Sequence, residues 1–208
     1  CSSTNGSGVS TCTMTSTYAE VKTLSITSPI IKADGAVTFV ADSPAVATST
    51  ITGTSSIVAD GSATSTVTIT ILDANSNPIS GTTPTFSATD TGTTNSYNAC
   101  SSTNGSGVST CTMTSTKAEV KTLSIASPIT KADGAVTFVA DSPAVATSTI
   151  TGTSSIVADG SSTSTITITI LDANSNPISG TTPTFSATDT VTTNSYNACS
   201  STNGLGVS

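Results

Sequence analysis

The stretch TSTVTITILDA, from Thr64 to Ala74, alternates small polar residues with the aliphatic residues Val67, Ile69 and Ile71. Successive side chains of a β-strand point to opposite faces, so this alternation places the aliphatic residues on one face of a half-buried strand. The following segment DANSNPISG, from Asp73 to Gly81, is rich in turn-forming residues and ends the strand.

Further short strands are expected on both sides of this segment. They are predicted around Phe86, in NSYNACSS (95–102) and over residues 107–116, 118–127 and 134–140, with turn signals such as Asn104-Gly105 between them. About seven short strands in roughly a hundred residues are typical of an immunoglobulin-like sandwich. We therefore expect an all-β fold.

Residues 1–99 and 100–198 are nearly identical. The six mismatched pairs are Tyr18/Lys117, Thr27/Ala126, Ile31/Thr130, Ala63/Ser162, Val67/Ile166 and Gly92/Val191. A period of 99 residues is too long for a solenoid, whose repeats run to about 50 residues. The sequence therefore predicts independent immunoglobulin-like domains in tandem, joined into an extended rod.

The segment VADSPAVATST interrupts the strand pattern at Pro44 and again at Pro143. We place one complete domain at 47–145, the C-terminal part of a preceding repeat at 1–46, and the N-terminal part of a following repeat at 146–208. The two partial repeats are complementary, because half a sandwich leaves its core face and strand edges open. Either a neighbouring chain supplies the missing strands or the chain is a segment of a continuous polymer, with any signal peptide or anchor outside it.

Composition excludes several classes of partner. Net charge is −7, and the five basic residues are all lysine, too few for a phosphate-neutralising patch. We expect no nucleic-acid partner and no binding to anionic membrane surfaces. No apolar run approaches the ~20 residues of a membrane span.

The cysteines recur with the repeat. Cys100 and Cys111 flank Asn104-Gly105, a strong hairpin signal, so we predict a disulfide between them and an equivalent one between Cys1 and Cys12. Cys199 is left unpaired, because its partner would fall beyond Ser208. Inert buried thiols are the alternative, and zinc is disfavoured because the pair has no histidine and no CxxC spacing. A disulfide implies an oxidising, extracytoplasmic compartment.

Several motifs in order resemble the group 1 bacterial immunoglobulin-like domain, the repeat of invasin- and intimin-type surface adhesins. They are the VADG turn (58–61), DANSNPISG (73–81), the GVST strand start after Asn-Gly, and the closing VTFVADSPA. The sequence departs from the family at Ser76, where glycine is usual, and in its cysteine pair. The resemblance implies an extracellular, bacterial surface location and spacer duty, with host receptor binding in a domain outside this chain.

We expect no enzyme, since His and Arg are absent and the remaining candidates lie in predicted turns. The recurring acidic residues Glu20, Asp34, Asp42, Asp60, Asp73 and Asp90 are interpreted as turn stabilisers. No cofactor is expected. The sharper alternative is calcium at a domain junction, with oxygen ligands from Asp42 and Asp60.

Four lysines are interpreted as solvated rather than as partners in an amide crosslink to Asn or Asp: Lys22, Lys32, Lys121 and Lys131. Asn5-Gly6-Ser7 and Asn104-Gly105-Ser106 match the N-glycosylation pattern, which the hairpin turn explains equally well.

Three functions remain, in order of preference. The first is a structural spacer of a cell-surface adhesin. The second is a self-associating extracellular filament, whose half-domains are completed head to tail by strands of a neighbouring chain. The third is a module whose repeats bind a host protein or glycan, for which few hot-spot residue types are present.

Overall fold

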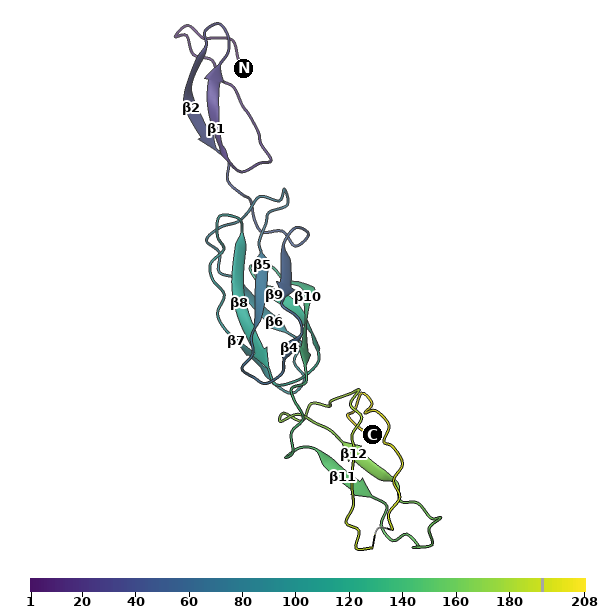
Figure 1. The fold of residues 1–208 in the computed structure, drawn as a ribbon. Coiled ribbons are helices and arrows are strands. Elements are labelled where there is room, and N and C mark those ends of the chain that lie inside the picture. Colours follow the sequence, from purple (N-terminus) through teal and green to yellow (C-terminus); the bar gives the residue numbers. More distant parts are fainter. Residues whose placement is uncertain (192) are drawn as a thin grey trace.

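The computed structural model describes residues 1–191 and 193–208, and these residues form strands and loops without a helix. The all-β prediction is confirmed. Three units follow one another along the chain and lie end to end in an elongated molecule (Figure 1). In the described part of the chain, no helix is long and apolar enough to cross a membrane.

The middle unit is a sandwich of two four-stranded sheets. One sheet has the order β3 (Thr50–Gly53), β5 (Ser65–Thr70), β8 (Val108–Ser115), β7 (Asn95–Tyr97). The other has the order β4 (Ile57–Val58), β10 (Lys131–Val139), β9 (Val120–Ser127), β6 (Thr85–Ala88). β4 runs parallel to β10, and the other pairs are antiparallel.

The core of the middle unit lies between these sheets. Alternate residues of β5 and β8 supply one side of it, and alternate residues of β9 and β10 supply the other. The main contributors are Val67, Ile69, Cys111, Met113, Leu123, Ile125, Val136 and Phe138, all fully buried or nearly so. The alternation read from Thr64 to Ala74 is thus the pattern of a core strand.

The outer units contain the same strands but only part of a sandwich. The N-terminal unit has β1 (Val21–Ile26) and β2 (Lys32–Thr38), and the C-terminal unit has β11 (Thr149–Gly152) and β12 (Ile166–Thr169). β1–β2 has the register of β9–β10, including the bulge, and β11–β12 has the register of β3–β5. Each outer pair therefore adopts the geometry of the complete unit while leaving one face uncovered.

The cysteine hairpins are alike in the first two units. Disulfides join Cys1 to Cys12 and Cys100 to Cys111, and Cys199 is a free thiol of intermediate exposure. In the turn between Cys100 and Cys111, Asn104 Oδ1 accepts hydrogen bonds from the N–H groups of Ser106 and Val108, at 2.9 and 3.1 Å. Gly107 follows with φ +75°, and a Cβ there would lie 2.5 Å from the carbonyl oxygen of Ile71. Only glycine fits this position without a backbone shift.

Candidate functional site at the junctions between repeats

The DANSNPISG loop folds around one buried carboxylate. Asp73 Oδ1 accepts hydrogen bonds from the N–H groups of Asn75 and Asn77, each at 2.8 Å. Asn77 Nδ2 donates to Asp73 Oδ2 at 2.8 Å, and both side chains are almost completely buried. Ser76 takes up the left-handed conformation, with φ 65°, a backbone region that favours glycine.

The same asparagine joins this loop to the preceding unit. Asn77 Oδ1 accepts a hydrogen bond from the N–H of Ala19 at 2.8 Å, and Nδ2 donates to the carbonyl oxygen of Thr17 at 2.9 Å. The side-chain amide thus bonds two backbone groups lying 58 and 60 positions earlier in the chain, as a neighbouring strand would.

The second junction repeats this arrangement. Asn176 Oδ1 accepts from the N–H of Ala118 at 2.8 Å, and its Nδ2 donates to Thr116 O at 2.9 Å and to Asp172 Oδ2 at 2.8 Å. Asn174 Nδ2 adds a bond to the carbonyl oxygen of Ala59 at 3.0 Å. Two junctions with matching distances set the repeats at one defined geometry.

At each junction, the linker between the two units also forms hydrogen bonds to the aspartate loop. The N–H of Asp42 donates to Asp73 Oδ2 at 3.0 Å, and the N–H of Ala45 donates to Leu72 O at 2.8 Å. At the second junction, Asp141 and Ala144 make the same bonds to Asp172 and Leu171. Linker, loop and preceding domain therefore meet at one aspartate–asparagine pair.

Hydrogen bonding keeps this carboxylate ionised. Burial alone would raise the pKa of Asp73, but the bonds from Asn77 Nδ2 and from the N–H groups of Asp42, Asn77 and Asn75 outweigh it and lower the pKa to about 2. The pKa of Asp172 is lowered in the same way. A depressed pKa means that the carboxylates contribute stability above the unfolded-state pKa of about 3.9, and that this contribution is lost as pH falls toward the folded value.

Asp42 and Asp60, the residues of the alternative calcium interpretation, lie at opposite ends of the middle unit. Asp60 lies just after β4, at the end of the middle unit that also carries Asp141, because β4 runs parallel to β10. Its Oδ1 accepts from the N–H groups of Ser62 and Ala63, at 2.7 and 2.6 Å. Asp42 lies at the opposite junction, beside Asp73. Within the described residues, no three His, Cys, Asp or Glu side chains group closely enough to hold a metal ion.

The other acidic residues serve turns and ion pairs. Asp90 accepts from Thr94 and from the N–H of Asn95, which is the turn-stabilising role expected for it. Asp34 pairs with Lys32 at 2.7 Å, and Glu20 pairs with Lys22.

The interpretation of Lys121 and Lys131 as solvated is wrong. Lys121 is completely buried, with Nζ 2.6 Å from Glu119 Oε1 and 3.9 Å from Asp90 Oδ1. Lys131 is mostly buried and donates from Nζ to the carbonyl oxygen of Ser49 at 2.6 Å. Both side chains contact groups from segments that the N-terminal unit lacks, and their counterparts in that unit, Lys22 and Lys32, are more exposed, at 30% and 57%.

Comparison with known protein families shows to which family these repeats belong. The model of the family described as invasin, domain 3, matches residues 45–141 and again residues 144–208. The chain belongs to this family. The invasin- and intimin-type resemblance read from the VADG and DANSNPISG motifs is thereby confirmed.

Solved structures of adhesins have the same fold. FdeC, an Escherichia coli adhesin, is 28% identical with a TM-score of 0.56, and the match covers 69% of this chain and 47% of FdeC. Invasin, described as a bacterial integrin-binding protein, is 27% identical with a TM-score of 0.55, over 74% of this chain and 32% of invasin. Yersinia pseudotuberculosis InvD has the same fold, at 20% identity and a TM-score of 0.56, over 78% of this chain and 52% of InvD.

The chain thus spans about half or less of these relatives. No curated protein matches it. At the level of the family, the chain is a set of immunoglobulin-like domains of the kind found in bacterial surface adhesins.

Proposed function

We propose that this chain is a spacer in a bacterial cell-surface adhesin, where it holds a receptor-binding domain outside these residues away from the cell. The observation that supports this most directly is the repetition of the Asn77 junction at Asn176, with matching partners and distances. A stalk needs joints that resist bending, and buried directional hydrogen bonds provide that resistance.

The length of such a stalk grows with copy number. The nine residues of β10 span about 30 Å at ~3.3 Å per residue, so each repeat adds roughly 30 to 45 Å once the end loops are included. Because the repeats are nearly identical in sequence, further copies extend the rod without a new kind of interface.

Surface composition supports a spacer over a binding module. Aromatic residues make up 3% of the chain and arginine is absent, whereas interface hot spots are enriched in Trp, Tyr and Arg. The relatives named as an adhesin and as an integrin-binding protein are considerably longer than this chain. We accordingly place the host receptor partner with domains beyond these residues.

Small-angle X-ray scattering on the monomeric chain tests the rigid junction. Asn176→Ala leaves the N–H of Ala118, the carbonyl of Thr116 and the Asp172 carboxylate without their partner, so we expect a shorter mean end-to-end distance and a broader distance distribution. Asn98→Ala, which removes an exposed bond to Thr112 within the middle unit, is the matched control and leaves the curve unchanged. A wild-type curve already typical of freely jointed beads contradicts the proposal.

A further inference from the structure

The first and the last segments of the middle unit lie side by side. Residues 49–59, which include β3 and β4, contact β10 at positions that rise together along both segments. The neighbouring pairs are Ser49 with Lys131, Ile51 with Gly134, Gly53 with Val136, Ile57 with Phe138, and both Val58 and Ala59 with Val139. The two segments therefore run in the same direction over the length of the unit.

Each end of this pair of segments has its own hydrogen bond. At the start, Lys131 Nζ donates to the carbonyl oxygen of Ser49 at 2.6 Å, and the lysine side chain is only 16% exposed. At the other end, the N–H of Ala59 donates to Val139 O at 2.8 Å, beside the parallel β4–β10 pair. We call residues 49–59 together with β10 the edge clamp.

The chain also enters and leaves the middle unit through the edge clamp. It enters from the first junction just before Ser49 and leaves toward the second junction after Val139. At the second junction, Asn174 Nδ2 donates to the carbonyl oxygen of Ala59 at 3.0 Å, so the clamp is bonded to the joint. A pull on the two neighbouring units draws the two segments past each other along their own length. Because the segments run in the same direction, this motion is shear, and all the contacts between them oppose it together.

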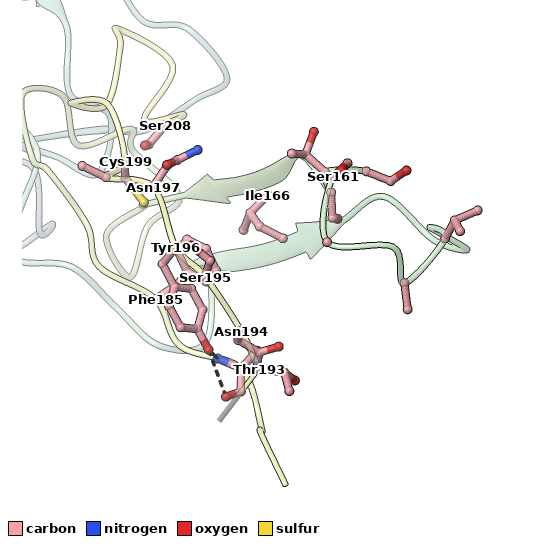
Figure 2. Close-up of a pocket in the computed structure, with 18 of the residues that line it drawn as sticks. Ser161, Ile166, Phe185, Thr193, Asn194, Ser195, Tyr196, Asn197, Cys199 and Ser208 are labelled. Atoms are coloured by element: carbon pink, nitrogen blue, oxygen red, sulfur yellow. Dashed lines mark hydrogen bonds between the residues drawn. The ribbon is translucent and has the colours of Figure 1, made fainter. Parts of the chain in front are cut away.

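The opposite edge of the sandwich lies outside this path. There β6 and β7, at the far ends of the two sheets, are joined by Phe86 and Tyr97, whose ring centroids lie 5.3 Å apart. The same aromatic pair recurs in the C-terminal unit, where Figure 2 shows Phe185 and Tyr196 and the centroids lie 5.4 Å apart. Since the chain neither enters nor leaves the middle unit along β6 or β7, a pull on the neighbouring units does not act on this edge directly.

We propose that the edge clamp keeps the repeat folded when the stalk is under tension, and that Lys131 fixes the last strand to the first. The inference rests on the proposed spacer function, since tension reaches a repeat only in a chain that is held at both ends. It makes a separate claim, because a stalk whose joints resist bending does not need repeats that resist pulling.

Constant-force spectroscopy on the full chain, tethered by its two ends, measures the lifetime of the middle unit under tension. This unit is recognised by the longest extension, which grows when a reductant opens the Cys100–Cys111 bond. The growth is about 40 Å, for a sequence separation of 11 at ~3.6 Å per residue. We expect the wild-type unit to extend in a single step, because shear breaks the contacts of the clamp together.

Two variants separate the clamp from general stability. Lys131→Met keeps most of the side-chain packing and removes the bond to Ser49. We expect it to shorten the lifetime at constant force about tenfold, the effect of losing one hydrogen bond from a charged donor. Tyr97→Phe is the matched control, because it also removes a polar group that bonds to the backbone, here at Ala88, but on the opposite edge. We expect its lifetime to equal that of the wild type, and circular dichroism checks that both variants are folded.

A short first step that releases β10 alone from the wild-type unit overturns the proposal, and this observation needs no folded variant. A wild-type lifetime in Lys131→Met also overturns it. So does a lifetime in Tyr97→Phe as short as that of Lys131→Met, because a general loss of stability then explains the effect. The scattering curve tests the joints separately, so failure of the clamp is distinguishable from failure of the spacer function.

Discussion

At the scale of single residues, Lys121 shows how residue type can mislead where position does not. Lys121 shares the phase of Leu123 and Ile125 along β9, and all three side chains are completely buried. A strict alternation argument places the lysine inside, whereas the usual preference of lysine for solvent places it outside. The lysine is buried, as its position in the strand predicts, because Nζ reaches the carboxylates of Glu119 and Asp90 at the margin of the core.

The buried ion pair predicts which of two substitutions destabilises the middle unit more. Lys121→Met keeps most of the packing and leaves two partly exposed carboxylates that water can solvate, so we expect a change of less than about 1.5 kcal/mol. Glu119→Ala leaves the buried ammonium without its nearest partner and costs about 3 to 5 kcal/mol. Urea unfolding followed by circular dichroism measures both.

The exposed Lys32 provides the control for that comparison. Lys32→Met is expected to change the unfolding free energy of the middle unit by nothing measurable, because Lys32 pairs only at the surface of another unit. If Lys121→Met proves more destabilising than Glu119→Ala, pairing with Glu119 is not the main stabilising contact of the Lys121 ammonium, because methionine keeps most of the packing of the side-chain stem.

The junction asparagines mark the limit of prediction at this scale. The side chains of Asp73 and Asn77 form the turn that the sequence predicts, and that part of the site is readable from residue type. The bonds from Asn77 to Thr17 and Ala19 are not, because they join groups 60 and 58 positions apart. The repetition of the whole DANSNPISG segment is the available signal, but repetition alone does not separate a turn from a joint.

At the scale of elements, the two disulfide hairpins lie in different surroundings, because the middle unit is a two-sheet sandwich and the N-terminal unit has a single two-stranded sheet. Cys111 is buried in the core of the middle unit, whereas Cys1 and Cys12 are exposed. The Cys100–Cys111 bond closes a loop with a sequence separation of 11. Such a bond stabilises the folded state by restricting the unfolded chain, by about 3 kcal/mol for a loop of similar length.

Removing each bond separately tests this difference. Cys100→Ala with Cys111→Ala is expected to lower the unfolding free energy of the middle unit by about 2 to 3 kcal/mol. Cys1→Ala with Cys12→Ala is the matched control and leaves that transition in place. Thermal unfolding monitored by calorimetry distinguishes them, and equal effects of the two pairs would count against independent units.

The positions of the strands can largely be predicted from the sequence, but which strand faces are buried cannot. Period-two alternation locates β5, β8 and β9, because each buries one face. The same letters give exposed strands in β1, where Leu24 and Ile26 face solvent. Local sequence sets the strand and its register, but only the presence of a partner sheet decides whether the apolar face is buried.

At the scale of the whole molecule, the repeat boundary decides which piece of chain is an autonomous domain. The linker residue Ala45 donates to Leu72 O at 2.8 Å and its carbonyl accepts from Ser49 N at 3.1 Å, so this short segment is bonded to the middle unit. The boundary of 47–145 proposed from the proline interruption leaves these bonds out. The family match begins at residue 45 and ends at residue 141.

Two polypeptides of the middle repeat test the boundary directly. Residues 42–141 keep both backbone bonds of Ala45, whereas residues 47–145 lose them, and at about 1 kcal/mol per bond the shorter start costs about 2 kcal/mol. For a domain of this size, that corresponds to a melting temperature lower by roughly 10 °C. We expect residues 42–141 to unfold in one cooperative transition, at the temperature of the middle-unit transition in the full chain. Equal melting temperatures of the two polypeptides would show that Ala45 belongs to a flexible linker, and the rigid joint would then rest on the Asp73–Asn77 pair alone.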